Sequence, residues 1–333
     1  MANLTTRFFG LDLKTPVIIG SAGLSNSVDK IRLLAENGAG AVVLKSVFEE
    51  EIYNEFQSEF EKQAVGHHNL EHLDYFDYEI KNDKVKQYLE LIQGVKKAGI
   101  DIPLVASINC TSGSDWVFFA KKLAEAGADA LELNLFVLPS DIERSAEQVR
   151  EYYFTTINKV IEASTIPVSV KLSPYFSDLA KMIKELSETK LAGITLFNRF
   201  YNVDIDIENK ELVPAKILSH PFEYLQSLRW LGIMSGHVEC DLAASTGIHD
   251  YETAIKMIMA GASAVQVVSG IYKHGYDFVK ELVVGLGKWM DEHNVEGIPE
   301  LIGAANASGA KNPALYERVQ FMKYFGGYDQ KVE

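Results

Sequence analysis

Cysteine is scarce in this sequence, and so are the features of several large protein classes. The 333 residues include two cysteines, Cys110 and Cys240, too few for a disulfide framework or for the thiolates of an iron–sulfur cluster. No apolar run approaches the roughly 18 residues of a membrane-spanning helix. The segment 1–7 lacks the basic and apolar regions of a signal peptide. These absences predict a cytoplasmic protein stabilised by a hydrophobic core.

Basic residues are also outnumbered. The chain has 32 Lys and Arg against 46 Asp and Glu, which gives a formal net charge of −14. A surface of this sign repels the phosphates of nucleic acids and of anionic membranes, so we expect neither as a partner. His67 and His68 have no spaced partner ligands, so no metal site is expected. We expect a small-molecule substrate and a homodimer.

The glycine-rich motif of dinucleotide-binding sheets is missing as well, since no G-x-G-x-x-G segment is present. What recurs is a helix that ends in Gly, then a small residue and a β-rich run, at 37–44, 126–133, 192–197 and 260–267. Such repetition is typical of successive β–α modules. Strands are predicted at 16–21, 41–45, 104–109, 130–134, 168–172, 193–198, 241–245 and 264–268. With amphipathic helices between them, they predict an α/β fold, a (β/α)8 TIM barrel that spans 1–333 as one domain.

Two connections, 47–83 and 199–221, are too long to be simple turns. Each follows a predicted strand at its carboxyl end, where the active sites of barrels lie. We expect them to be lids over the site or, alternatively, surface excursions or oligomer contacts.

Small residues follow the last two predicted strands. Thr246 and Gly247 follow one strand, and Ser269 and Gly270 follow the next. Such turns expose backbone N–H groups without bulky side chains, which suits a phosphate where barrels of this type commonly hold one. The alternative is that small residues merely permit tight turns. Asp250 is predicted to cap the helix between these two strands.

Polar side chains stand at the ends of five predicted strands. They are Lys45, Asn109, Asn134, Lys171 and Asn198. A buried lysine is costly unless it is paired or faces a ligand. Two amines and three amides at one end of a barrel suit a flat, electron-rich ligand, because amines stabilise negative charge and amides bind carbonyl and N–H groups.

Five segments carry a likeness to a known family. They are Leu44-Lys45-Ser46, Glu132-Leu133-Asn134-Leu135, Val170-Lys171-Leu172-Ser173-Pro174-Tyr175-Phe176, Thr246-Gly247-Ile248 and Val265-Gln266-Val267-Val268-Ser269-Gly270. Together they resemble dihydroorotate dehydrogenase, in particular its class 1, over about residues 9–276. The resemblance implies an FMN-containing barrel that oxidises dihydroorotate to orotate in pyrimidine biosynthesis, or a related planar substrate, by hydride transfer to flavin N5.

The resemblance also implies roles for single residues. The phosphate of FMN is expected at Thr246, Gly247, Ser269 and Gly270. The other cofactor-binding residues are expected to be Ala22, Gly23, Lys45, Asn134, Lys171 and Ser219. Lys45 is expected to act in catalysis as well, and Asn198 to bind the substrate.

The half of the site that would hold dihydroorotate departs from the family pattern. The family carries its catalytic base after strand four, in Ser-Cys-Pro-Asn or as a serine nearby, where this chain has Phe136-Val137-Leu138-Pro139-Ser140-Asp141. Ser140 is the nearest hydroxyl and is our candidate base, with Asp141 as a substitute. Gln63 and Arg199 stand where the family has Asn and Ser, and we expect both to contact the substrate.

Two other functions stay open. One is a cofactor-free barrel of the aldolase or epimerase type, in which Lys171 or Lys45 forms a Schiff base and the small-residue turns hold a substrate phosphate. The other is a catalytically impaired, flavin-binding homologue. The sequence does not indicate the electron acceptor, which could be fumarate, NAD through a partner subunit, a quinone or oxygen.

Overall fold

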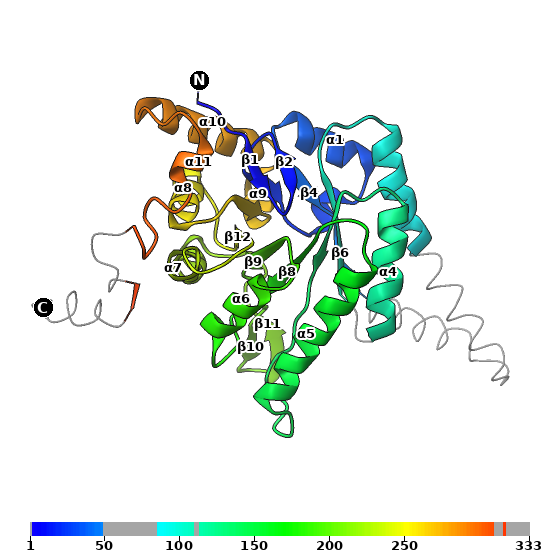
Figure 1. Ribbon diagram of the computed structural model, residues 1–333. Helices are drawn as coiled ribbons and strands as arrows, with labels where there is room; N and C mark the ends of the chain where they lie inside the picture. The colour runs from blue at the N-terminus through cyan, green and yellow to red at the C-terminus, as the bar shows by residue number, and fades with distance from the viewer. Residues whose placement is uncertain (1, 49–84, 110–112, 310–315, 318–333) are drawn as a thin grey trace, which may run out of the picture.

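Parallel strands form a closed ring at the centre of the molecule (Figure 1). The computed structural model describes residues 2–48, 85–109, 113–309 and 316–317. The order around the ring is β4, β3, β13, β12, β9, β8, β7 and β6, and a pairing between β4 and β6 closes it. These strands are β3 (Val17–Ile19), β4 (Ala41–Val43), β6 (Leu104–Asn109), β7 (Ala130–Leu133), β8 (Val168–Leu172), β9 (Gly193–Leu196), β12 (Asp241–Ser245) and β13 (Ala264–Val267). The predicted (β/α)8 TIM barrel is therefore confirmed.

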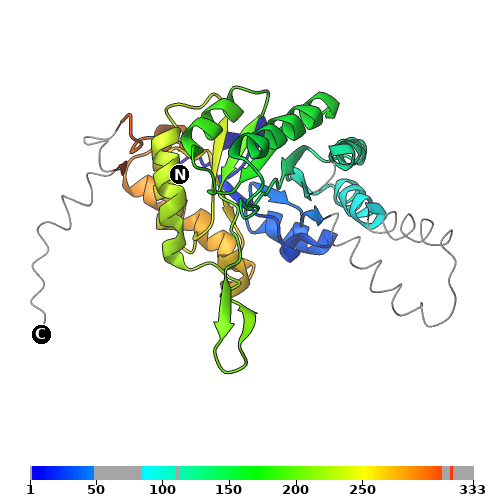
Figure 2. The same cartoon turned by 90° about the horizontal axis from the view of Figure 1, so that it is seen from below.

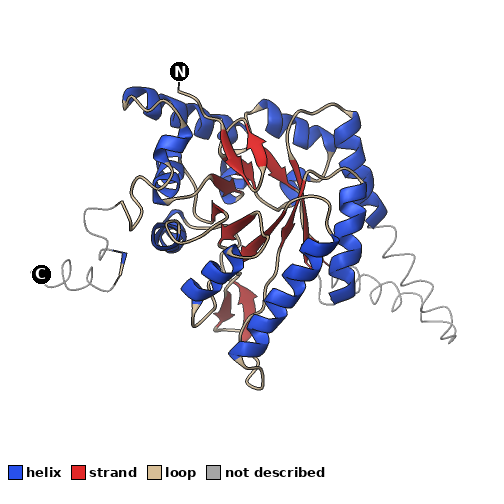
Figure 3. Ribbon diagram, in the orientation of Figure 1, coloured by secondary structure: helices blue, strands red, loops and turns tan. Residues whose placement is uncertain are grey.

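Helices surround the ring and cover its outer face (Figure 3). They include α1 (Val28–Glu36), an unlabelled helix at 85–97, α4 (Gly113–Glu125), α5 (Ala146–Ala163), α6 (Leu179–Ser187), α7 (Tyr224–Met234), α8 (Tyr251–Ala260) and α10 (Asp277–Glu292). The predicted cap of α8 is confirmed, because the Asp250 carboxylate accepts the Thr253 N–H at 2.6 Å. Among the described residues, none of the helices has the length and apolar composition needed to cross a membrane.

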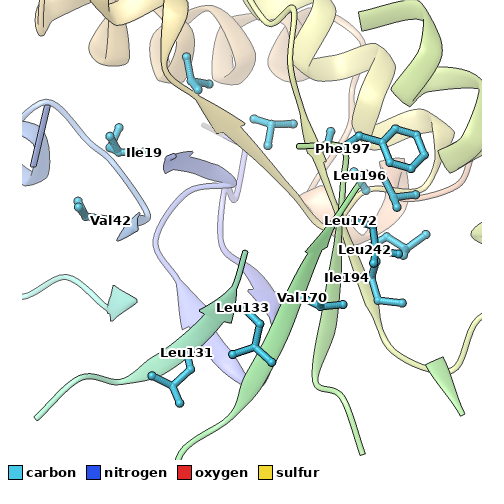
Figure 4. Packing of buried hydrophobic residues seen from close by; sticks show 14 of the residues in the cluster. Ile19, Val42, Leu131, Leu133, Val170, Leu172, Ile194, Leu196, Phe197 and Leu242 are labelled. Atoms are coloured by element: carbon cyan, nitrogen blue, oxygen red, sulfur yellow. The ribbon is translucent and has the colours of Figure 1, made fainter. Parts of the chain in front are cut away.

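Each barrel strand is buried on both faces, because one face meets the helices and the other meets the barrel interior. Leu131, Val170 and Ile194, which lie on neighbouring strands, belong to a large cluster formed with helix side chains (Figure 4). Ala130 and Val105 belong instead to a second cluster inside the ring. The continuous apolar runs of the sequence thus serve two cores at once.

A short hairpin closes the amino-terminal end of the barrel. It consists of β1 (Thr6–Phe8) and β2 (Leu11–Leu13), and sequence patterning did not predict it. Phe8 and Phe9 are buried in the interior cluster beside Ile18 and Ala243, which lie in the middle of β3 and β12. This end is filled with apolar side chains, so space for a ligand is left at the carboxyl ends of the strands.

The predicted insertion at 199–221 contains a hairpin that projects from the barrel (Figure 2). It is formed by β10 (Val203–Asp206) and β11 (Glu211–Pro214), with Ile205 paired to Leu212. Its alternating apolar residues face solvent, since Ile205 is 61% exposed and Leu212 is 73% exposed. The sequence predicted an insertion at this position but did not predict the hairpin within it.

The predicted insertion at 47–83 lies almost entirely outside the described residues. Its first two residues form the short strand β5 (Val47–Phe48), which pairs with β6. At the other end of the chain, α9 (Ser269–His274) follows β13 directly, and α11 (Ile298–Leu301) is the helical part of the predicted C-terminal tail.

Candidate functional site

A cavity of about 840 Å³ opens at the carboxyl ends of the barrel strands. Its volume falls within the range of about 300–1,000 Å³ that is usual for small-molecule sites. Most of the residues predicted for the site line this cavity: Ala22, Gly23, Lys45, Asn134, Lys171, Asn198, Arg199, Ser219, Thr246, Gly247 and Ser269. Asn109, the remaining strand-end amide, lines it too.

Three predicted site residues are not among those that line the cavity. Ser140 is exposed, and its backbone N–H donates to the Leu138 carbonyl at 2.8 Å. Gly270 is buried in the first turn of α9, against Phe278. Gln63 lies outside the described residues.

The bottom of the cavity carries a buried polar network. Glu132 stands between two leucines that face the helices, so its side chain faces the barrel interior, where Lys171 and Gln266 also lie. The Lys171 ammonium donates to Gln266 Oε1 at 2.9 Å, and Gln266 Nε2 donates to Glu132 Oε2 at 2.5 Å. Thr195 Oγ1 donates to the same carboxylate oxygen at 2.9 Å. The amide of Gln266 therefore links the ammonium to the carboxylate.

Two features of this network point toward a ligand. Burial lowers the pKa of the Lys171 ammonium, and the Glu132 carboxylate offsets part of that shift. Glu132 Oε1 is buried and accepts no hydrogen bond from the described residues. Buried polar atoms without partners are uncommon, and in a cavity they mark a position where a ligand or water donates.

The turn after β12 lines the cavity and has an unusual backbone conformation. Thr246 has a φ of 79° and Gly247 a φ of 77°, both in the left-handed region. The Thr246 hydroxyl donates to the Phe197 carbonyl at 3.2 Å, which fixes the turn against the end of β9. The N–H groups of Thr246 and Gly247 donate to none of the described residues. Such a turn forms an anion-binding concavity.

The segment around Ser219 covers the start of α9. The Ser219 N–H donates to Ser269 Oγ at 2.9 Å, and the Lys273 ammonium donates to the Ser219 carbonyl at 2.9 Å. The Ser219 hydroxyl lies 3.0 Å from His249 Nε2, and burial lowers the pKa of that imidazole. These contacts join the turns after β12 and β13 into one polar pocket with a cation beside it.

Two amides meet on another side of the cavity. Asn198 Nδ2 donates to Asn134 Oδ1 at 2.9 Å, which links the ends of β7 and β9. This bond leaves an N–H donor on Asn134 and a carbonyl acceptor on Asn198, neither of which bonds to a described residue. Together they suit the alternating N–H and C=O groups of a cyclic amide.

Arg199 lines the cavity, but its guanidinium is engaged with the protein. It donates to the Glu223 carboxylate at 2.7 Å and to the carbonyls of Ile217 and Lys216 at 2.6 and 2.9 Å. Burial raises the pKa of Glu223, but hydrogen bonds from Arg199 and from the His220 N–H outweigh it, so the net shift is downward. Arg199 therefore fixes the segment that leads to α7.

Sequence reasoning missed a row of three serine hydroxyls on the opposite side. Ser46 Oγ lies 3.1 Å from Ser21 Oγ and 2.7 Å from Ser107 Oγ, and all three residues line the cavity. Their signal was available in the sequence, because each serine lies within or just after an apolar run predicted to be a strand.

Aromatic side chains near the cavity were missed as well. Phe136, Phe200 and Tyr201 line it, at the ends of β7 and β9. Phe136 and Phe200 are stacked, with ring centroids 4.5 Å apart and an angle of 18° between the rings. They come from segments 64 positions apart in the chain, so only the closed barrel brings them together.

Metal ligands do not gather in the described part of the chain, where no group of three or more His, Cys, Asp and Glu side chains could hold an ion. Cys240 is a free thiol, and burial raises its pKa to about 12. Such a thiol stays protonated near neutral pH and is a poor nucleophile.

Comparison with known proteins gives a consistent result. The sequence model of a family described as dihydroorotate dehydrogenase matches residues 3–290. The chain is 27% identical over 318 residues to the catalytic subunit of dihydroorotate dehydrogenase B (NAD(+)) from Thermoplasma acidophilum, which covers 92% of this chain and 99% of that protein. The Pyrococcus furiosus protein of the same name is 26% identical over 315 residues, covering 91% and 99%.

A relative with a different name matches over a similar span. The NAD-dependent dihydropyrimidine dehydrogenase subunit PreA of Escherichia coli is 24% identical over 327 residues, covering 91% of this chain and 77% of that protein. The relatives therefore differ in the ring that their names say they act on.

Proposed function

The chain belongs to the dihydroorotate dehydrogenase family, and from that premise we propose that it is an FMN-dependent oxidoreductase of pyrimidine metabolism. The family consists of oxidoreductases that act on CH–CH bonds. The substrate we propose is dihydroorotate or a related planar ring, and the site is the cavity at the carboxyl ends of the strands.

The observation that carries this proposal is the polar pocket formed by the turns after β12 and β13. Thr246 and Gly247 offer backbone N–H groups that no described residue uses, and Ser269 begins α9 beside them. A helix start and a turn of this kind attract a phosphate through their N–H groups. The Lys273 ammonium, held at the Ser219 carbonyl, adds positive charge nearby.

The residues along the rest of the cavity fit a flat ring system joined to that phosphate. Ala22 and Gly23 carry little or no side chain, which lets a ring approach the backbone. Lys171, Asn134 and the unpartnered oxygen of Glu132 provide donors and an acceptor for a heterocycle. These features support FMN as the cofactor, with Lys171 as the cation that stabilises its negative charge.

When bound, FMN would accept a hydride from one carbon of the substrate CH–CH bond. The neighbouring carbon must transfer its proton to a base, which leaves a C=C bond in the product; the candidates that the sequence offers for this base, Ser140 and Asp141, lie on the exposed loop after β7. Lys45 lines the cavity at the end of β4 and is our candidate for stabilising the charge that develops on the ring. Asn198 and Asn134 hold the substrate through its amide groups.

Electrons must then leave the site. The names of the relatives from Thermoplasma acidophilum and Pyrococcus furiosus describe catalytic subunits linked to NAD(+). This supports a partner protein as the immediate electron acceptor, in addition to the homodimer that we expect.

The proposal is tested by titrating the purified full-length chain with FMN and recording the flavin absorbance near ~450 nm. We expect one FMN to bind per chain, and anaerobic addition of dihydroorotate or a dihydropyrimidine to bleach the band. A chain that retains no flavin absorbance after incubation with excess FMN and removal of the unbound FMN would overturn the proposal and favour the cofactor-free barrel. A chain that binds FMN but is bleached by none of these rings would be the impaired homologue.

A further inference from the structure

The hairpin of β10 and β11 turns an apolar side toward solvent. Ile205 pairs with Leu212 and Val203 pairs with Pro214, so these four side chains lie on one face of the two-stranded sheet. We call them the apolar face of the hairpin. Val203 is 70% exposed, and Ile205 and Leu212 are exposed to a similar degree. An antiparallel sheet commonly packs its apolar face on a core, so this face is suited to contact another surface.

The acidic residues of the hairpin lie on its other face. Asp204 and Asp206 alternate with the apolar residues of β10, and Asp206 is paired directly with Glu211 on β11. Carboxylates in directly opposite positions repel each other, so this face is best left in water. The apolar face itself carries no charged side chain. A counterpart that covers it must therefore be apolar as well.

The base of the hairpin is fastened to the barrel. The Ala215 N–H donates to the Asn202 carbonyl at 3.0 Å, which continues the ladder beyond the two strands. The Arg199 guanidinium donates to the carbonyls of Lys216 and Ile217 on the returning segment. The hairpin thus projects from the barrel in a fixed orientation (Figure 2). A surface that is ordered in advance binds a partner at a lower entropic cost.

Exposed apolar residues are concentrated around this hairpin. Within the described residues, more than half of the exposed large apolar side chains lie between positions 200 and 225. Phe222 and Leu225, after the hairpin, extend this surface along the chain. A stable interface covers about 800 Å² on each partner, so a short hairpin needs such additional area. Apolar surface gathered in one projecting segment is typical of a protein–protein interface.

The distribution of charge favours a second copy of the chain as the occupant. Two hairpins related by a twofold axis would bring Ile205 and Leu212 of one copy against the same residues of the other. The carboxylates of both hairpins would then face outward into water. The segment 49–84, which lies outside the described residues, has 11 acidic and 3 basic residues. It would add negative charge beside Asp204 and Asp206, which makes it a poorer occupant.

We propose that the apolar face of the β10–β11 hairpin forms the contact between two copies of this chain, which pack their hairpins face to face. Such packing buries the alternating apolar residues of both copies and leaves the acidic faces on the outside. The proposal goes beyond the proposed function, because it assigns the surface through which the chain self-associates and does not depend on FMN.

Sedimentation of the full-length chain at a series of protein concentrations tests the proposal. We expect the wild type to be a dimer and Ile205→Lys to weaken it at least about thirtyfold, as expected for a central interface residue. Ile142→Lys is the matched control, because Ile142 is 94% exposed in the loop before α5, and this variant should remain dimeric. A monomeric wild type, or a dimer that Ile205→Lys leaves intact or that both variants lose equally, overturns the proposal.

A mixture of two variants shows whether the hairpins meet each other. Ile205→Lys and Ile205→Glu should each be mainly monomeric, because an unpaired charge is costly to bury. Mixed together they should form a dimer, since opposite charges then meet across the twofold axis. Ile205 is exposed in the single chain, so both variants should keep the fold, which far-UV circular dichroism checks. A mixture that stays monomeric overturns the face-to-face packing.

Discussion

The Lys171 ammonium and the Glu132 carboxylate do not touch but are joined through Gln266, which accepts from the first at 2.9 Å and donates to the second at 2.5 Å. An amide between the two charges keeps the ammonium at the bottom of the cavity, where it remains able to donate to a ligand. A direct ion pair would turn it away. The network therefore serves to position a cation as well as to stabilise the barrel.

Replacing Lys171 with methionine should weaken FMN binding by about tenfold or more, since a charge-assisted hydrogen bond contributes about 1.5–3 kcal/mol. Lys280→Met, on the exposed face of α10, is the control and should leave the affinity unchanged. FMN titration of both variants by absorbance measures the effect. Equal affinities in the wild type and in Lys171→Met would remove the role assigned to this ammonium.

The same variant has a predictable pH dependence. Because the pKa of Lys171 in the folded chain is below its ordinary value of 10.5, the unfolded chain binds more protons between those two values. This group therefore makes the free energy of unfolding rise with pH in that window. We expect the rise to be smaller in Lys171→Met, as measured by urea denaturation at a series of alkaline pH values. If the unfolding free energies of the wild type and of Lys171→Met change with pH in parallel, the lowered pKa of Lys171 is contradicted.

Arg199→Ala should loosen the segment that leads to α7 more than it affects the substrate. Its hydrogen bonds to Glu223 and to two carbonyls would be lost, at a cost of about 1–2 kcal/mol for a partly exposed group. Limited proteolysis should then cut near 199–223 more quickly, while KM changes less than about twofold in line with surface substitutions. A large rise in KM with unaltered proteolysis would support the substrate contact predicted from the sequence.

Acidic pH should weaken the ion pair between Arg199 and Glu223. The pKa of Glu223 is lowered in the folded chain, so its contribution to stability is present above the ordinary carboxyl value of 4.5 and is lost as pH falls through the lower, folded value. The difference in unfolding free energy between the wild type and Arg199→Ala should shrink over that range. A difference that stays constant with pH would mean that the guanidinium acts there through packing alone.

The parts of the fold that the sequence predicted correctly share a physical cause. Strands buried on both faces need continuous apolar runs, so segments such as 193–198 stood out, and Asp250 was recognisable because a helix start needs an acceptor. The hairpins β1–β2 and β10–β11 escaped notice. The first has three-residue strands, and the second alternates Val203 and Ile205 on a face that is not buried.

The site residues also divide into those that the sequence predicted and those that it did not. Lys171 and Asn134 were found because polar residues are conspicuous at the ends of apolar strands. Phe136 and Phe200 were not, because aromatic residues are ordinary core residues and nothing in the sequence records that the barrel stacks these two. Ser140 was chosen for its nearness in sequence to Asn134, but residues 138–141 are exposed and Ser140 does not line the cavity.

Ser140→Ala tests that candidate base directly. Since Ser140 does not line the cavity in the described structure, we expect turnover to stay within about twofold of the wild type, as for most surface substitutions. Steady-state rates with the ring that bleaches the flavin measure this. The variant Asp141→Asn is measured in the same way to test the substitute base. A loss of a hundredfold or more, about the contribution of a general base, would mean that the loop turns inward during the reaction.

The phosphate pocket can be tested through two glycines that both have a positive φ. Gly247 has a φ of +77° and Gly99 a φ of +61°, so alanine at either position takes a φ that L side chains rarely adopt, at a cost of roughly 1–2 kcal/mol. They differ in space, because a Cβ at Gly247 would overlap the backbone nitrogen of Tyr224, while one at Gly99 would meet nothing within 4 Å. The comparison therefore tests the packing of the turn against the start of α7.

Gly247→Ala should consequently lower the free energy of unfolding by more than Gly99→Ala does, and should also weaken FMN binding, because the turn that offers the Thr246 and Gly247 N–H groups must move. Gly99→Ala should keep the wild-type affinity for FMN. Urea denaturation and FMN titration of the two variants measure both effects. If both variants lose stability equally and bind FMN as the wild type does, the turn is only a connection, and the cofactor phosphate must bind elsewhere.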